Sequence, residues 1–155
     1  MKCRNATLVD AEQISVVLKE CYNIDSNKEG KKVFLTEVKK QYRYIVAVEK
    51  GKVAGITSWQ MHGLPKHMVC ELDRIAVLSE YRGKGVAKQL FDALVKSADA
   101  EYKKYGFRMR KLYLLTHVEN KRARRFYEKL GLSHETTLKK HYYADKDECV
   151  YSRFF

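Results

Sequence analysis

The sequence predicts a single α/β domain over residues 1–155, with a mixed, mostly antiparallel sheet, one central parallel pair of strands, and helices on both faces. Three observations lead to this class. Segments with strand periodicity alternate with segments of helical periodicity. Two strand-like segments flank the turn-like residues 49–52, as in an antiparallel hairpin. The strand–helix–strand segment 67–118 needs a crossover, and a right-handed crossover makes its two strands parallel.

In the amino-terminal half, apolar residues at helical spacing follow Asp10, a candidate N-cap, and recur in residues 31–41. The expected core positions of these two helices are Ile14, Val17, Leu18, Cys21, Phe34, Leu35 and Val38. The predicted strands of this half are residues 4–9, 44–48, 53–60 and 67–78.

The carboxy-terminal half begins with the longest predicted helix, residues 83–105, in which apolar residues recur every four positions. A buried strand, residues 111–118, follows it. A short helix, residues 120–130, then ends at Gly131, a natural C′ residue. The last predicted strands are residues 133–143 and 148–155.

Composition and charge narrow the class of protein. The chain has no apolar run of the roughly 18 residues that a membrane span needs and no apolar signal-peptide core, so we expect a soluble, cytoplasmic protein without a membrane partner. Its four cysteines form no C-x-x-C pair, which predicts reduced thiols and no metal site. The net charge of +12 favours anionic ligands. Nucleic acid is permitted but not expected as a partner, and a homodimer is left open.

A glycine-containing turn opens the longest helix, where residues 79–87 read Ser-Glu-Tyr-Arg-Gly-Lys-Gly-Val-Ala. Such a turn directs successive backbone N–H groups, and the positive end of the helix dipole, towards a phosphate. Gly83 and Gly85 allow unusual φ angles, while Arg82 and Lys84 add positive charge. The turn is neither a P-loop nor a G-x-G-x-x-G motif, so by itself it is weak evidence for phosphate binding.

Two segments together resemble the signatures of the GNAT N-acetyltransferase superfamily. After a hydrophobic strand, Arg82, Gly85 and Ala87 fit the pattern R/Q-x-x-G-x-G/A, and residues 120–132 look like the second signature, N-x-x-A-x-x-F/Y-Y-x-x-x-G-F. The resemblance implies the GNAT fold, with about seven strands and a central parallel pair that splays apart. It also implies an N-acetyltransferase that uses acetyl-coenzyme A as cosubstrate, without a metal.

The resemblance further implies where acetyl-CoA binds. The pantetheine arm would enter the gap between the splayed strands and pair with the backbone of residues 75–77. The pyrophosphate would contact the amides of residues 83–87, and Asn120 would lie near the pantetheine portion. The residues expected to bind acetyl-CoA are Ile75, Ala76, Val77, Arg82, Gly83, Lys84, Gly85, Val86, Ala87 and Asn120.

Acetyl transfer needs a neutral amine, a polarised thioester carbonyl and a proton for the departing thiolate. Tyr127 matches the family tyrosine beside the cofactor sulfur and would supply the proton, unless it is a core aromatic. The backbone N–H of Val77 would polarise the carbonyl. Glu71, eleven residues before Arg82, matches the catalytic glutamate of the histone-acetyltransferase branch. Asp73 lies on the same face of a regular strand, so either carboxylate is a candidate base or a salt-bridged surface group.

The carboxy-terminal segment bears on the acceptor. Tyr142 and Tyr143 belong to a stretch that looks like the Y-Y-x-x-G-E-D segment of N-terminal protein acetyltransferases, in which the tyrosines help to hold the substrate. Lys146 replaces the usual glycine, and two tyrosines also suit a strand without any ligand. Leu115 stands where the ribosomal-protein alanine acetyltransferase branch has a glutamate, so direct equivalence to that enzyme is not expected.

The expected acceptor is a protein amine. An α-amino group has a pKa near 8, against about 10.4 for lysine, so a larger fraction is neutral at pH 7. This favours a protein N-terminus over lysine. Small-molecule amines, such as a polyamine, an amino acid or an antibiotic, are the alternative, and a binding module without turnover is the rival from another class.

Overall fold

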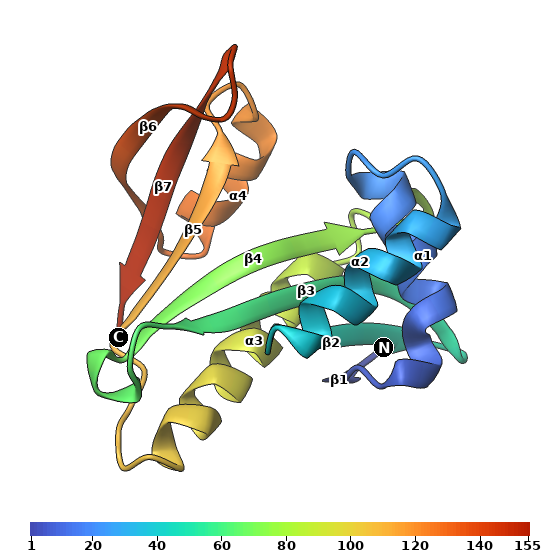
Figure 1. Ribbon diagram of the computed structural model, residues 1–155, viewed down its shortest axis with the longest axis horizontal. Coiled ribbons are helices and arrows are strands. Elements are labelled where there is room, and N and C mark those ends of the chain that lie inside the picture. Colours follow the sequence, from blue (N-terminus) through green and yellow to red (C-terminus); the bar gives the residue numbers. More distant parts are fainter. The chain divides into compact units, whose positions relative to one another are not determined.

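The computed structural model describes all residues from 1 to 155, and they form one mixed seven-stranded sheet with four α-helices (Figure 1). The strand order is β1-β2-β3-β4-β5-β7-β6, and β4 and β5 form the parallel pair. The strands are β1 Lys2–Asn5, β2 Arg43–Glu49, β3 Lys52–His62, β4 Val69–Val77, β5 Lys111–His117, β6 Ser133–Tyr143 and β7 Lys146–Phe154. The helices are α1 Ala11–Cys21, α2 Asn27–Lys39, α3 Val86–Lys103 and α4 Lys121–Lys129. The predicted α/β class, hairpin and parallel pair are confirmed.

The chain divides into two compact units, each described by itself below. The N-terminal unit comprises Met1–Gln60 and Arg74–Asp99. The C-terminal unit comprises Met61–Asp73 and Ala100–Phe155. Strand β4 therefore contributes its first five residues to the C-terminal unit and its last four to the N-terminal unit.

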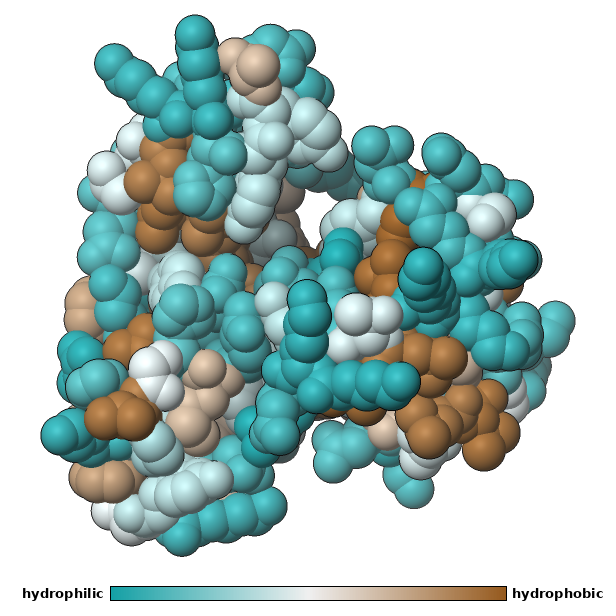
Figure 2. All heavy atoms as spheres, in the orientation of Figure 1, coloured by the Kyte–Doolittle hydropathy of each residue, from teal (hydrophilic) through white to brown (hydrophobic).

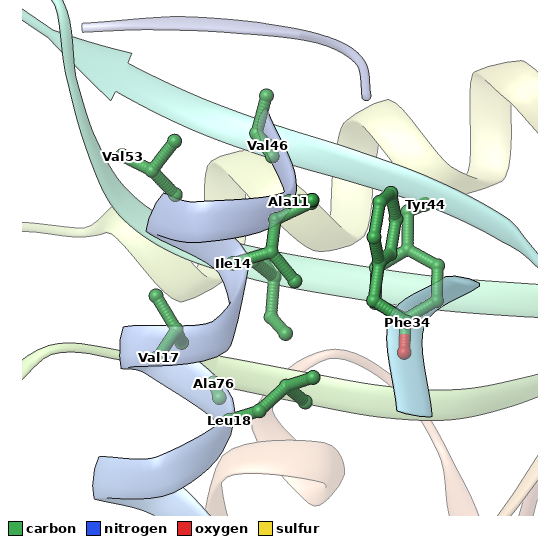
Figure 3. Packing of buried hydrophobic residues seen from close by; sticks show 10 residues of the cluster. Ala11, Ile14, Val17, Leu18, Phe34, Tyr44, Val46, Val53 and Ala76 are labelled. Atoms are coloured by element: carbon green, nitrogen blue, oxygen red, sulfur yellow. The ribbon is translucent and has the colours of Figure 1, made fainter. Parts of the chain in front are cut away.

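The core of the N-terminal unit lies between α1, α2 and one face of the strands. Buried α1 side chains, among them Ile14 and Leu18, pack with Phe34 of α2 and with Val46 of β2. Figure 3 shows these residues around α1 in front of the strands, with α3 behind the strands. The two faces of this part of the sheet therefore carry different helices, as the sequence predicts.

The start of the chain differs from its prediction. The first strand is shorter than residues 4–9, because a 3₁₀ turn occupies Leu8–Asp10. Asp10 does not cap α1 with its side chain. Its carboxylate instead accepts hydrogen bonds from the Thr7 N–H at 2.7 Å and from the Arg4 guanidinium at 2.7 and 2.8 Å. The arginine, with a smaller contribution from Thr7, lowers the pKa of the buried Asp10 carboxyl to about 2.

Because of this lowered pKa, the free energy of unfolding of the N-terminal unit decreases at low pH. Because the folded pKa lies below the unfolded value near 3.9, the stabilisation is present above about pH 4 and is lost as the pH falls through 2. The pKa shift corresponds to about 2 kcal/mol of stability. Because the Arg4 side chain is 41% exposed, solvent screens the ion pair and lowers its contribution to about 1 kcal/mol. We expect Asp10→Asn to lower the free energy of unfolding by that amount at pH 7 and by much less near pH 2. Urea titrations at both pH values measure it, and an equal loss at both would contradict the ion-pair explanation.

In the C-terminal unit, α4 covers one face of β5 and β7. Along β5, the buried Leu112, Leu114 and Thr116 alternate with half-buried residues. Arg124 of α4 donates to the hydroxyl of Tyr151. Tyr151 lies on β7, where it pairs with Leu114 of β5. The half-buried residues of β5 therefore point to the opposite face of the sheet.

Most predicted boundaries hold to within a few residues. Besides β1, which ends at Asn5 rather than at residue 9, the main exception is α2. It begins at Asn27 rather than at residue 31, with the Ser26 hydroxyl accepting from the Glu29 N–H as N-cap. Gly131 has φ +82° directly after α4, as expected for a C′ residue. Lys146 pairs with Tyr143 inside the β6–β7 hairpin and has no positive φ, so this position does not require glycine.

The surface is mainly polar. Figure 2 shows hydrophilic side chains over most of the visible face, with hydrophobic side chains gathered in smaller separate areas. No helix is long and apolar enough to cross a membrane. All four cysteines are free, and no group of three or more His, Cys, Asp or Glu side chains is arranged to hold a metal ion.

Candidate active site

The glycine turn lies in the N-terminal unit, between the 3₁₀ turn Ser79–Tyr81 and the start of α3 at Val86. Gly83 and Gly85 both have φ +76°, which side chains with a Cβ rarely adopt. A Cβ built on either glycine would meet no heavy atom within 4 Å, so the turn faces open space. The first amides of α3 have no partner in the preceding turn of helix. The turn thus has the open space and the glycine conformations that the predicted phosphate site requires.

We expect the double substitution Gly83→Val and Gly85→Val to raise the dissociation constant for acetyl-CoA at least about 100-fold, because the turn can no longer direct its amides at the pyrophosphate. Calorimetry measures this directly. The matched control is Gly51→Val with Gly106→Val, which have φ +79° and +82° and the same open space around a Cβ. The control should lose similar stability and keep its affinity. Equal weakening in both proteins would contradict a role of the turn in binding.

Arg82 turns back towards β4. Its Nε donates to the Val77 carbonyl at 2.9 Å, and its guanidinium lies 3.9 Å from Glu20. The Cys21 thiol also points at the Val77 carbonyl, at 3.7 Å. The side chain of Arg82, which the sequence predicts to bind acetyl-CoA, therefore connects the glycine turn to the end of β4. Lys84 places its ammonium 5.4 Å from the centre of the Tyr81 ring.

Tyr22, after α1, contacts the backbone of the same part of β4. The Ile75 N–H donates to the Tyr22 hydroxyl at 3.1 Å, and this hydroxyl lies 3.3 Å from the Ile75 carbonyl. The Arg74 guanidinium stacks 4.8 Å above the Tyr22 ring and makes a 2.7 Å ion pair with Glu37 of α2. The backbone of residues 75–77, expected to pair with pantetheine, is thus contacted by side chains of the N-terminal unit.

Glu71 lies in the C-terminal unit, at the paired end of β4 and β5. The hydroxyl of Tyr113 donates to Glu71 Oε2 at 3.0 Å, and His62 Nε2 lies 3.0 Å from the same oxygen. The rings of His62 and Tyr113 meet edge to face at 5.5 Å. Burial and the nearby Glu71 carboxylate raise the pKa of Tyr113, so its hydroxyl remains a donor at working pH. The Glu71 carboxylate is therefore only 13% exposed and is contacted by two side chains, those of His62 and Tyr113.

The other predicted site residues occupy defined places. Asp73 follows Glu71 on β4 and is half-buried. Asn120 is the N-cap of α4, where its Oδ1 accepts from the Ala123 N–H at 3.1 Å. This capping bond uses the oxygen of the side chain, and its NH₂ group is a separate donor.

Tyr127 is buried on the inner side of α4, 7% exposed, with its ring 6.3 Å from that of Tyr151. Burial raises the pKa of Tyr127 to about 12. The phenol is therefore protonated across the working pH range of an enzyme. It is both a core aromatic and a strong candidate for a buried hydrogen-bond donor.

The predicted acceptor tyrosines lie at the end of β6, with Tyr142 62% and Tyr143 43% exposed. The ring of Tyr143 lies 5.7 Å from that of His117, at the end of β5. His117 Nδ1 is 2.5 Å from Oε1 of the buried Glu148, opposite it on β7. Leu115 lies two residues before His117 on the same face of β5.

Sequence reasoning missed His62, Tyr113 and Tyr22. Tyr113 is directly opposite Glu71 in the parallel register of β4 and β5, and this register follows from the fold rather than from a spacing along the sequence. His62 ends β3, and Tyr22 follows α1, so neither sits in a recognisable motif. Their contacts arise from the tertiary fold.

Comparisons with known proteins identify the class of this chain. The family described as Acetyltransferase (GNAT) family matches residues 11–132. An N-alpha-acetyltransferase of Sulfurisphaera tokodaii is 30% identical, over 95% of this chain and 88% of that protein. N-acetylaspartate synthetase of Xenopus tropicalis is 33% identical, over 71% of this chain and 38% of that protein. A putative GNAT acetyltransferase from Desulfovibrio desulfuricans has a similar fold, with a TM-score of 0.80 at 21% identity over 99% of this chain and 98% of that chain.

The chain therefore belongs to the acetyltransferase (GNAT) family, and it has the GNAT fold. Its class of activity is N-acetyl transfer, and the family implies acetyl-CoA as the acetyl donor and an amine as the acceptor.

Proposed function

We propose that this chain transfers the acetyl group of acetyl-CoA to a primary amine, and that its preferred acceptor is the α-amino group of a protein or peptide. The observation that carries the proposal is the Glu71 carboxylate, held at one oxygen by His62 and Tyr113. Two partners fix its position on the strand, as a general base requires.

Glu71 is the proposed base. It takes the proton that the amine nitrogen must lose when the new N–C bond forms, directly or through one water. The hydrogen bond from Tyr113 orients the carboxylate, and His62 contacts the same oxygen, so the two act as positioning residues. Asp73 is the alternative base, two residues further along β4.

Tyr127 is the proposed donor to the leaving sulfur. A thiol has an ordinary pKa near 8.5, so complete proton transfer from a phenol with a pKa of about 12 is uphill by roughly 5 kcal/mol. A hydrogen bond from the phenol still stabilises the negative charge that develops on sulfur as the thioester C–S bond breaks. The final proton reaches the thiolate from solvent or through this phenol.

The Val77 N–H is the proposed donor to the thioester carbonyl. The neighbouring Ile75 N–H donates to the Tyr22 hydroxyl, while Val77 is engaged through its carbonyl. The glycine turn and the first amides of α3 would hold the pyrophosphate, with the side chains of Arg82 and Lys84 adding positive charge.

Two arguments support an α-amino acceptor. The Sulfurisphaera tokodaii relative is named an N-alpha-acetyltransferase. An α-amino group is also far more often neutral at pH 7 than a lysine side chain, so it needs less help from a base. The exposed Tyr142 and Tyr143, of which Tyr143 lies beside His117, would contact the backbone of a peptide acceptor.

A small-molecule amine is the second candidate. One observation favours it, since the Xenopus tropicalis relative is named N-acetylaspartate synthetase. Lysine acceptors are the remaining option within proteins.

A panel of acceptors tests the proposal, with release of free CoA thiol as the readout. The panel contains two peptides: one has a free N-terminus and no lysine, and the other has a blocked N-terminus and one added lysine. Spermidine and free amino acids complete the panel. We expect the highest kcat/KM for the peptide with the free N-terminus. Faster turnover of the blocked lysine peptide or of spermidine would contradict the α-amino assignment.

A further inference from the structure

A shallow basic pocket of about 530 Å³, largely open to solvent, lies beside the β3–β4 loop, within the C-terminal unit. Its lining includes His62, Lys66, His67, Met68 and Arg110, and none of its lining residues is acidic. A hollow of this size accommodates a small ligand or one side chain of a larger one. Lys66 and Arg110 give it two positive charges at neutral pH.

Two donors of this pocket, on the exposed residues His67 and Arg110, are positioned by hydrogen bonds with the nearby backbone. His67 ends the 3₁₀ turn Pro65–His67, and its Nδ1 accepts the Leu64 N–H at 3.1 Å, so in the neutral ring the proton lies on Nε2. Arg110 donates through Nη2 to the His67 carbonyl at 3.2 Å. This bond uses one of the five N–H groups of the guanidinium, and the planar fork suits a carboxylate.

One residue joins this pocket to the candidate base. His62 lines the pocket, and its Nε2 lies 3.0 Å from Glu71 Oε2. An anionic group bound in the pocket is thus separated from Glu71 by one imidazole ring. Joint binding would require the amine and the acidic side chain of one acceptor to lie on either side of this ring.

We propose that this pocket binds a carboxylate of the acceptor, so that the chain acetylates acidic amines in preference to their uncharged amides. The proposal rests on the proposed acetyl transfer and adds the class of acceptor. It requires Lys66 and Arg110 for charge and the Nε2–H of His67 as a donor. It leaves Glu71 as the base.

Matched acceptor pairs test this preference at fixed ionic strength. The pairs are peptides that differ only as Asp against Asn, or Glu against Gln, in the first two positions, together with free aspartate against asparagine. We expect the acidic member to have a kcat/KM at least about tenfold higher, as a charged hydrogen-bonded pair gives. The variant Lys66→Gln with Arg110→Gln should lower this ratio to about one and change kcat/KM for the amides less than about twofold.

The matched control removes two lysine charges elsewhere. Lys28 and Lys32 are exposed on α2, in the N-terminal unit, and Lys28→Gln with Lys32→Gln should keep the tenfold ratio. An equal fall of the ratio in this control would show a general effect of net charge and would overturn the pocket assignment. Equal rates for acidic and amide acceptors in the unsubstituted protein would also overturn it.

Binding without turnover separates this proposal from the proposed function. Glutarate and its diamide are titrated while the ring C–H signals of His62 and His67 are followed by NMR. We expect glutarate to shift both signals and the diamide to shift neither, with the glutarate effect lost in Lys66→Gln with Arg110→Gln. If glutarate binds but no amine is acetylated, the pocket stands and the proposed function fails. If amines are acetylated but glutarate does not bind, the pocket proposal fails alone.

Discussion

Replacement of Tyr127 by Phe is expected to lower kcat about 100-fold or more, while the affinity for acetyl-CoA stays nearly unchanged. The substitution removes one hydroxyl from a buried ring and keeps its packing. That hydroxyl, protonated because burial raises the pKa of Tyr127 to about 12, is proposed to act on the sulfur only as the C–S bond breaks. Removal of one such donor to a developing charge typically costs 10²- to 10³-fold in rate. Steady-state kinetics and calorimetry with acetyl-CoA measure the two quantities.

Tyr151→Phe is the matched control for this substitution. Tyr151 is fully buried on β7, and its hydroxyl donates to Glu128 and accepts from Arg124. Its loss should lower the melting temperature and leave kcat within about threefold. If Tyr127→Phe keeps near-full activity, the phenol is only part of the core and the donor to sulfur must be another group.

Replacement of Glu71 by Gln is expected to lower the rate about 10²- to 10⁴-fold below pH 7 and progressively less above pH 8. At low pH the acceptor amine is protonated and needs a base. At high pH the amine deprotonates in solvent, so the carboxylate contributes less. The measurement is kcat/KM against pH for a peptide acceptor, for the unsubstituted protein and for the variant.

Two further variants locate the base. Asp73→Asn should have a weak effect without this pH dependence if Glu71 is the base. Tyr113→Phe removes the donor that orients Glu71 and should lower the rate less than Glu71→Gln does. If Glu71→Gln lowers the rate equally at every pH, Glu71 only positions the acceptor, and Asp73 becomes the better candidate.

The fold was largely predictable because the pattern along the chain is strong where the core is formed. α3 was found from its regular apolar repeat, and the β2–β3 hairpin from its polar turn. The start of α2 was missed although the pattern of Ser26 and Glu29 three residues later is a capping signal. The first turn of α2, which follows Ser26, has no large apolar residue. Gly30 in this turn packs against α1, where an added Cβ would lie 3.0 Å from the Ser15 carbonyl oxygen.

The candidate site was predictable only where a motif is local. The glycine turn and Tyr127 each belong to one continuous signature. The two partners of Glu71 come from the end of β3 and from β5, so no spacing along the sequence links them to Glu71 on β4. Asp10 occupies the predicted N-cap position of α1, but Arg4 and Thr7 bind the carboxylate that would otherwise have capped the helix. Where a carboxylate has several donors within reach, the tertiary structure decides which of them it binds.

The most direct test of acetyl transfer to an α-amino group is mass spectrometry of the acceptor after incubation with acetyl-CoA. A peptide with a free N-terminus and one internal lysine is used, and fragmentation locates the added acetyl group. We predict one acetyl group on the α-nitrogen, in a one-to-one ratio with the CoA thiol released, and almost none with the Glu71→Gln, Tyr127→Phe double variant. Thiol release without an acetylated peptide, or acetylation of the lysine with the N-terminus unmodified, would contradict the assignment.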